Sequence, residues 1–136
     1  MATIKSYTDL QQSKKLAEIL PLKSADMEYI LEQWIDEKTY RHKEAYCEIP
    51  VVKVEDDCPL QPITLDCWSL AALLGVIPKH IKDYNVLRID ISENEFAIWY
   101  DEIGCGVNNE LPDITKKTAI DACYEMIIKL HELKML

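Results

Sequence analysis

Cysteine and histidine are the residue types in this chain that could act as nucleophiles, bases or metal ligands. Five cysteines and three histidines make up the set: Cys47, Cys58, Cys67, Cys105, Cys123, His42, His80 and His131. They are scattered, without a C-x-x-C pair or two histidines at helical spacing, whereas zinc sites usually take their ligands in such pairs. Only convergence through the fold could unite Cys58, Cys67 and His80. We therefore expect no metal site and no cofactor.

Two of the cysteines could serve as a catalytic nucleophile, which needs a lowered thiol pKa. Cys67 falls in the first turn of an expected helix, the end at which a thiolate is stabilised. Cys105 stands between two glycines in an expected loop. In the other interpretation, Cys67 is a small core residue and Cys105 an incidental loop thiol. A small cysteine-dependent enzyme, with a histidine brought near Cys67 or Cys105, is accordingly the alternative function.

Tyrosine and tryptophan are the better candidates for a binding site. Seven of them fall in or beside segments that are hard to assign: Tyr29, Trp34, Tyr40, Tyr46, Tyr84, Trp99 and Tyr100. Such side chains are enriched where proteins bind partners. In the other interpretation, they only cover the sheet of a fold in which a sheet packs on helices. We take Trp99, Trp34 and Tyr100 as candidate binding residues, with Trp99 first.

Length and charge narrow the classes of function. A chain of 136 residues, 49% hydrophobic and 29% charged, predicts a single globular domain over 1–136. The formal net charge is −9, and it is spread evenly: residues 1–68 carry 8 basic and 13 acidic groups, and residues 69–136 carry 7 and 11. Nucleic-acid backbones and anionic membranes need clustered Lys and Arg. We therefore expect no direct nucleic-acid binding and no membrane association.

The start of the chain and its thiols indicate the compartment. The residues after Met1 are polar and show no secretory signal pattern, and the longest apolar stretch, 70–77, is too short to span a bilayer. The cysteine count is odd. These features predict a cytoplasmic protein with reduced thiols, and we expect a monomer or weak dimer.

Three helices are expected to form the scaffold. The first begins with a capping box of Thr8 and Gln11 and ends at Pro21. The second is a short buried helix over 64–77, capped by Thr64 or Asp66. The third has a Thr cap at 118 and apolar residues at helical spacing, which makes Cys123 a packing residue: Ile120, Cys123, Ile127 and Leu130.

Strands are expected between these helices. Residues 27–35 fit helical spacing and, less regularly, strand alternation. A strand is expected over 46–54, followed by a turn or loop at 55–59. A hairpin is clearer: residues 87–91 alternate, 92–95 turn the chain, and 96–100 alternate back, with Trp99 on the face opposite Phe96 and Ile98. Together, these helices and strands predict an α+β fold, in which an antiparallel sheet packs against the N-terminal, middle and C-terminal helices.

Three segments together carry a resemblance to a known group of proteins. They are residues 13–27 (SKKLAEILPLKSADM), 67–74 (CWSLAALL) and 120–133 (IDACYEMIIKLHEL). They resemble a family of short uncharacterised proteins of gut bacteria and their mobile elements or phages, over about half of the chain. The resemblance favours a strand over 27–35 and implies no activity. From the residues we expect a non-enzymatic protein-binding or adaptor module with an unidentified protein partner.

Overall fold

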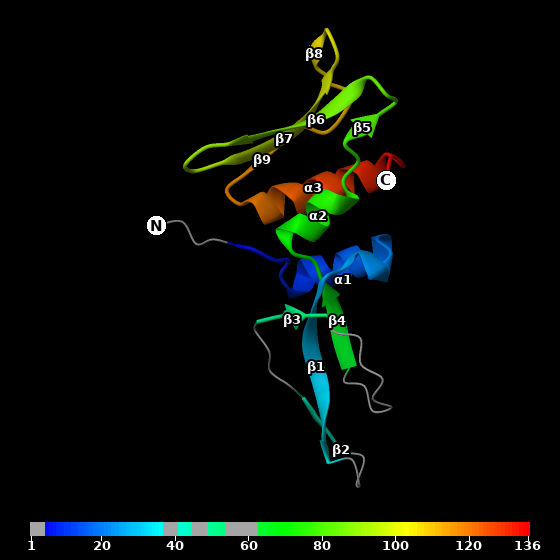
Figure 1. Cartoon of the computed structure of the whole chain (residues 1–136), viewed down its shortest axis with the longest axis vertical. Helices are drawn as coiled ribbons and strands as arrows, with labels where there is room; N and C mark the ends of the chain where they lie inside the picture. Colours follow the sequence, from blue (N-terminus) through cyan, green and yellow to red (C-terminus); the bar gives the residue numbers. More distant parts are fainter. Residues whose placement is uncertain (1–4, 37–40, 45–48, 54–62) are drawn as a thin grey trace. The chain divides into compact units, whose positions relative to one another are not determined.

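A computed structural model of the chain describes residues 5–36, 41–44, 49–53 and 63–136, with the backbone alone for 32–36 and 41–44. These residues form three α-helices and two antiparallel sheets, which confirms the predicted α+β class (Figure 1). They fall into two compact units, Asp9–Ser69, and Leu70–Leu136 with the N-terminal residues up to Thr8. A single domain over 1–136 stays a prediction.

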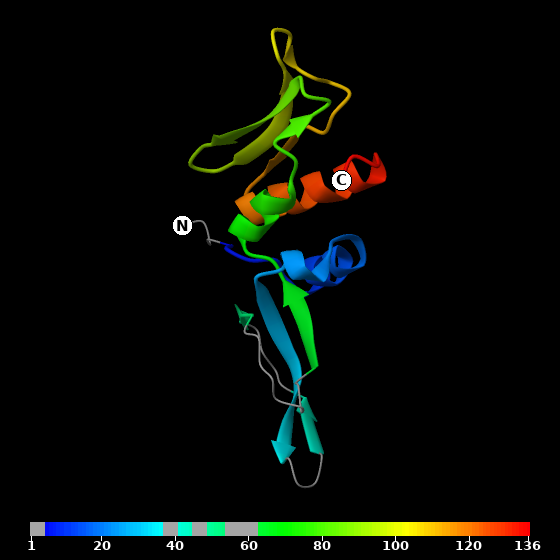
Figure 2. The ribbon, with the colours of Figure 1, turned by 45° about the vertical axis from the view of Figure 1, so that its right-hand side comes forward.

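The unit Asp9–Ser69 combines one α-helix and a short 3-10 helix with a sheet of four strands. Its elements are α1 (Leu10–Ile19), η1 (Leu22–Ser24), β1 (Met27–Asp36), β2 (Arg41–Glu44), β3 (Val51–Val52) and β4 (Ile63–Cys67). Strand β1 is central, and β2, β3 and β4 each pair with it in the antiparallel direction (Figure 2). Helix α1 packs against β4.

Helix α1 has its N-cap one residue later than predicted. The Asp9 carboxylate accepts a hydrogen bond from the Gln12 N–H at 2.8 Å, and the Gln12 side chain accepts one from the Asp9 N–H at 3.1 Å. The predicted box of Thr8 and Gln11 is therefore wrong by one position. Thr8 is fully buried, and the neighbouring exposed Asp is at least as good a cap. The helix ends before Pro21, as predicted.

Residues 27–35 form a strand. The backbone of β1 pairs with β4 along one part of its length and with β2 along another, and Tyr29 is only 2% exposed. Because a strand with partners along its length gains cross-strand packing, these contacts outweigh a sequence that also fits helical spacing. Of the strand predicted over 46–54, residues 49–53 are described, and of these only Val51–Val52 form a strand, β3. Residues 45–48 and 54, and the turn at 55–59, lie outside the described residues.

The helix predicted over 64–77 is wrong in its first part. Residues up to Cys67 continue β4, and helix α2 begins only at Leu70. Residues 64–67 form a strand despite their local helix signal, because β4 pairs with β1, a strand far away in the sequence. Trp68, which follows the strand, is fully buried, and its Nε1 donates a 2.9 Å hydrogen bond to Ser24 Oγ.

The second unit combines two helices with a sheet of five strands. Its elements are α2 (Leu70–Val76), β5 (His80–Ile81), β6 (Asn85–Ile91), β7 (Phe96–Glu102), β8 (Gly106–Val107), β9 (Ile114–Lys116) and α3 (Ala119–Glu132). Strand β6 lies between β5 and β7, and both β8 and β9 pair with β7. The strands β8 and β9 are not predicted from the sequence, since each is too short to show alternation.

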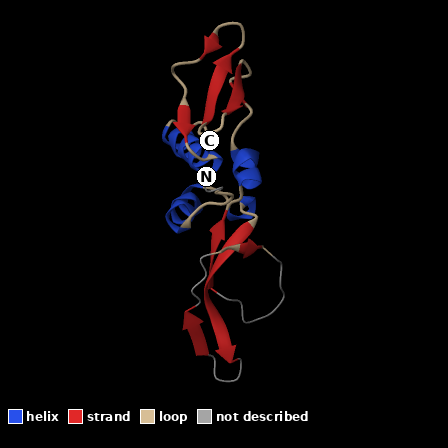
Figure 3. Cartoon of the chain, turned by 90° about the vertical axis from the view of Figure 1, so that its left-hand side faces the viewer, coloured by secondary structure: helices blue, strands red, loops and turns tan. Residues whose placement is uncertain are grey.

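The predicted hairpin is confirmed as β6 and β7. Exposure alternates along β7, so that Phe96, Ile98 and Tyr100 are buried while Trp99 is partly exposed. Helix α3 contacts β7 and β9 and lies on the side of these buried residues, which we call the inner face of the sheet (Figure 3). The opposite side, which carries Trp99, is the outer face.

Helix α3 matches its prediction. The Thr118 hydroxyl caps it by accepting a 3.1 Å hydrogen bond from the Asp121 N–H. The buried stripe of the helix contains Ile120, Ala122, Cys123, Met126, Ile127 and Leu130. The core of this unit thus lies between its helices and the inner face. No helix in the described part of the chain is long and apolar enough to cross a membrane.

Candidate binding surface

Trp99 stands near the middle of the outer face. The hairpin register places it directly opposite Arg88 of β6, and the next residues of β7 on the same face are Ala97 and Asp101. Directly opposed residues of an antiparallel pair project to the same side of the sheet. Trp99 is partly exposed, whereas the neighbouring Tyr100 is fully buried. Ordinary strand alternation is therefore what presents the indole ring on this face.

Asp101 connects the Trp99 indole to the Arg88 guanidinium. Trp99 Nε1 donates a 2.8 Å hydrogen bond to Asp101 Oδ1, and Arg88 Nε lies 3.3 Å from Asp101 Oδ2. We call these three residues the Trp99 cluster. The side chains of Arg88 and Asp101 are 56% and 30% exposed, so the ion pair itself contributes less than about 1 kcal/mol to stability. Its main consequence is positional, because the carboxylate holds the indole ring in one orientation.

Smaller and polar residues surround the Trp99 cluster. Register pairs put Val86 beside Asp101, and Asp90 and Thr115 on either side of Ala97. Within the described sheet, Trp99 is thus the largest apolar side chain of the outer face. In Figure 1 the helices α2 and α3 of this unit both lie on the other side of the sheet. The outer face is therefore a mostly polar surface with one tryptophan at its centre.

Neither of the other two aromatic candidates belongs to the outer face of this sheet. Trp34 lies in β1, in the other unit, with its backbone opposite His42 of β2, and its side chain is outside the described set. Tyr100 is a core residue: it is fully buried and its hydroxyl donates a 2.6 Å hydrogen bond to the Pro78 carbonyl. Burial also raises the pKa of Tyr100 well above its ordinary value. Because adjacent strand residues face opposite sides, Tyr100 and Trp99 do not share a surface.

The three described cysteines lack the surroundings of a catalytic thiol. Cys67, expected at a helix N-terminus, is instead the last residue of β4 and is fully buried. Cys123 is buried in α3, and this burial raises its pKa to about 11, against the opposing effect of the Lys79 ammonium. A raised thiol pKa is the reverse of what a nucleophile needs. Cys105 is exposed, while Cys47 and Cys58 lie outside the described residues.

Within the described residues, no histidine side chain makes a hydrogen bond to a cysteine. The side chains of His80 and His131 are exposed, and only the backbone of His42 is described. As far as the chain is described, the Cys105 side chain has no hydrogen-bond partner. The same part of the chain contains no group of three or more His, Cys, Asp or Glu residues arranged to hold a metal ion.

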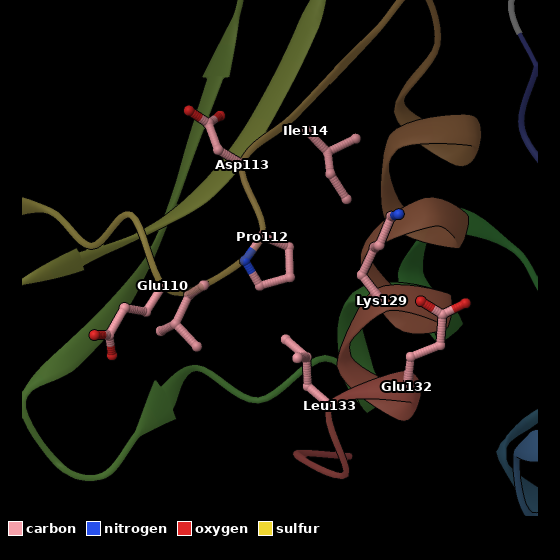
Figure 4. A pocket seen from close by; sticks show the side chains of 8 residues that line it. Glu110, Pro112, Asp113, Ile114, Lys129, Glu132 and Leu133 are labelled. Atoms are coloured by element: carbon pink, nitrogen blue, oxygen red, sulfur yellow. The ribbon is translucent and has the colours of Figure 1, made fainter.

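A small hollow lies between the segment preceding β9 and the C-terminal half of α3 (Figure 4). Its volume is about 270 Å³, and Pro112 and Leu133 are among its apolar lining residues. Sites for small molecules are usually larger, about 300–1,000 Å³, with polar groups that converge on the ligand. Here the carboxylates of Glu110 and Asp113 point away from the hollow (Figure 4). The hollow is therefore a small surface depression in which these two carboxylates do not converge.

Sequence reasoning misses two members of the Trp99 cluster, Arg88 and Asp101. The signal that could have found them is the predicted four-residue turn at 92–95, because closing it fixes which residues of the two strands oppose each other. That register places Arg88 opposite Trp99. Alternation then puts Asp101 on the same face as Trp99, apart from its neighbour Glu102.

No protein-family model, curated protein or solved structure matches this chain. The resemblance to short proteins of gut bacteria and their mobile elements or phages stays an expectation. What bears on function is therefore the geometry of the described residues.

Proposed function

We propose that the protein is a non-enzymatic protein-binding module whose contact surface is the outer face of the sheet β5–β9. The observation that carries the proposal is the partly exposed Trp99 indole, held in one orientation by Asp101. Tryptophan is among the residues that contribute most to binding energy when a partner buries them. Because the indole N–H already has its acceptor, a partner can cover the ring without leaving that donor unpaired.

The partner that we propose is a protein with a basic contact surface and an apolar recess for the indole. The chain has a formal net charge of −9. On the outer face itself, Asp90 is exposed and has no ion-pair partner in the described part of the chain. Opposite charges across an interface accelerate association and select partners. The same charge disfavours nucleic-acid backbones, which need basic patches.

We place this module in the cytoplasm, with a partner encoded by the host or by the same mobile element or phage. The free thiols of Cys105 and Cys123 support a reducing compartment. An inhibitor of the antitoxin or immunity type belongs to this class of function, since such proteins act by covering a surface of their target. A cysteine-dependent enzyme is not carried further, because the described thiols are either buried or isolated.

The test compares Trp99→Ala with Tyr84→Ala as a matched control. Tyr84 is also an aromatic residue of this unit, 46% exposed, and it lies in the turn between β5 and β6 rather than on the outer face. Partners are captured from a lysate of the producing cells with the unchanged protein, and the captured candidates are purified. The affinity of each candidate for the unchanged protein and for both variants is then measured by titration calorimetry, after circular dichroism has shown that both variants are folded.

We expect Trp99→Ala to weaken binding by about 30-fold or more, which is the usual effect of removing a central interface tryptophan. Tyr84→Ala should bind like the unchanged protein. Binding should also weaken as salt is raised, because the proposed partner is basic. Equal binding by the two variants, whether both retain affinity or both lose it, would contradict the proposal.

A further inference from the structure

Strand β6 has an edge that is closed along its first half and open along its second half. Strand β5 pairs only with the first two residues of β6, and the Leu87 N–H donates a 2.9 Å hydrogen bond to the Lys79 carbonyl on the same edge. Alternate residues of an antiparallel strand direct their N–H and C=O groups to opposite edges. The backbone groups of Ile89 and Ile91 therefore point to this edge as well, and no strand in the described part of the chain pairs with them there.

The inner side of the open edge is apolar. Ile89 and Ile91 project to the inner face, because they oppose buried residues of β7. They are nonetheless 40% and 73% exposed. A hollow of about 300 Å³ adjoins Ile91, with Leu70 and Phe96 in its lining. An open strand edge with apolar side chains tends to pair with another strand, and proteins usually protect such edges with charges, bulges or covering segments.

The outer side of the same edge carries two opposite charges. Arg88 donates its Nε to Asp101, which leaves both terminal nitrogens of the guanidinium for a second carboxylate. Asp90 is exposed and has no ion-pair partner within the described residues. From Ile91 back to Arg88, the edge therefore presents an apolar, an acidic, an apolar and a basic side chain in turn.

A second copy of β6 does not fit this edge. A two-fold axis at Ile89 would lay the second copy across Leu87, where the Lys79 backbone already lies. An axis at Asp90 would place Asp90 opposite its own equivalent, and like charges directly opposite destabilise a strand pair. A further shift in the same direction would bring the turn at 92–95 onto the edge. The strand that completes this edge has to come from a different sequence.

We propose that the open edge of β6 binds an extended segment of a partner protein, which adds to the sheet as an antiparallel strand of four residues. The first residue of the segment opposes Ile91, the second Asp90, the third Ile89 and the fourth Arg88. Charge complementarity then makes the second residue lysine or arginine and the fourth aspartate or glutamate, while the first and third are apolar. This proposal goes beyond the proposed function and does not depend on it.

The backbone and the side chains of the edge agree on this segment. Ile89 and Ile91 each exchange two backbone hydrogen bonds with the residue that they oppose. In strand addition such bonds provide affinity, and the alternating side chains provide specificity. The first side chain of the segment lies beside Ile91 and its hollow. A fifth residue would oppose Leu87, which Lys79 already covers, so the segment ends or turns away after the fourth residue.

The test is an NMR titration of the isotope-labelled full chain with the synthetic peptide acetyl-Ser-Val-Lys-Val-Glu-Gly-amide. The amide signals of Ile89 and Ile91 should shift, and their hydrogen exchange should slow, with a dissociation constant of about 1 mM for so short a segment. Replacing the lysine of the peptide with glutamate should weaken binding about fivefold, because the pair with Asp90 changes from opposite to like charges.

Asp90→Lys should reverse this preference. The variant should bind the glutamate peptide about fivefold more tightly than the lysine peptide, because the opposite-charge pair is restored. Asp113→Lys is the matched control, since it makes the same change of net charge at an exposed position outside β6. It should keep the preference of the unchanged protein for the lysine peptide.

Four results would overturn the proposal. The first is the absence of shifts at Ile89 and Ile91 with about 10 mM peptide. The second is an unchanged preference in Asp90→Lys, or a lost preference in Asp113→Lys. The third is slow hydrogen exchange of both amides before peptide is added, which would show that another segment of the chain covers the edge. The fourth is a shift of both amides with protein concentration alone, as pairing of two copies would produce.

Discussion

Raising the pH from 9 to 11 should destabilise the protein through the Cys123 thiol. This side chain is fully buried in α3, and burial raises its pKa from 9.0 to about 11, although the Lys79 ammonium acts in the opposite direction. Well below pH 9 the thiol is neutral in both the folded and the unfolded chain. Between the two pKa values the unfolded chain releases the proton while the folded chain keeps it. The free energy of unfolding therefore falls as the pH rises through this range.

The size of the effect follows from the shift. One pKa unit corresponds to about 1.4 kcal/mol, so a shift of about two units removes roughly 2–3 kcal/mol of stability once the pH exceeds 11. At pH 10.5 the loss is about 2 kcal/mol. At neutral pH there is no such term, and the buried sulfur contributes by packing alone. Replacing Cys123 with alanine at neutral pH should cost about 1–2 kcal/mol.

Urea unfolding of the unchanged protein and of Cys123→Ala at pH 7.5 and pH 10.5 measures this effect. Tyrosine and lysine side chains also titrate at the higher pH, so the informative quantity is the stability difference between the two proteins at each pH. We expect this difference to shrink by about 2 kcal/mol at pH 10.5, and its sign can reverse. Cys105→Ala, which removes an exposed thiol, should show no such change. A difference that stays constant for Cys123→Ala would refute the reasoning.

Two further experiments address the polar core and the thiols. Asn85 is 1% exposed, and its side chain donates a 3.0 Å hydrogen bond to the Ile81 carbonyl and accepts one of 2.8 Å from Asn108. Asn85→Leu removes both hydrogen bonds and should lower the free energy of unfolding, measured in urea, by about 2 kcal/mol. An unchanged urea midpoint would show that these two hydrogen bonds do not stabilise the fold. Iodoacetamide at pH 8 should alkylate Cys105 in the folded protein and leave Cys123 unmodified until urea is added, as read by peptide mass spectrometry; early labelling of Cys123 would contradict its burial.

The elements that the sequence predicts well are those whose signals are local. Helix α3 has a hydroxyl cap at Thr118 and an apolar stripe that includes Cys123, and both signals lie within its own residues. The hairpin β6–β7 is specified by two alternating runs and a short turn between them. In such cases the nearest neighbours in the sequence are also the neighbours in space.

The elements that the sequence mispredicts depend on distant partners. Residues 64–67 become a strand because β1, which begins at Met27, supplies the pairing. This changes the interpretation of Cys67 from a thiol at a helix terminus to a buried strand residue. The cap of α1 shows the same principle on a smaller scale, since the tertiary burial of Thr8 leaves capping to Asp9. Propensity cannot anticipate a choice that packing makes.

The candidate binding surface falls between these two cases. That Trp99 would be presented on a sheet face is predicted from alternation, but its fixed orientation depends on the register that brings Arg88 and Asp101 beside it.

Arg88 and Asp101 contribute differently to the Trp99 cluster. The indole orientation rests on the Trp99–Asp101 hydrogen bond, which the chain makes by itself. Arg88 contacts the same carboxylate through its Nε, so its removal would leave the indole N–H with its acceptor. The presentation of Trp99 therefore depends on Asp101 more than on Arg88.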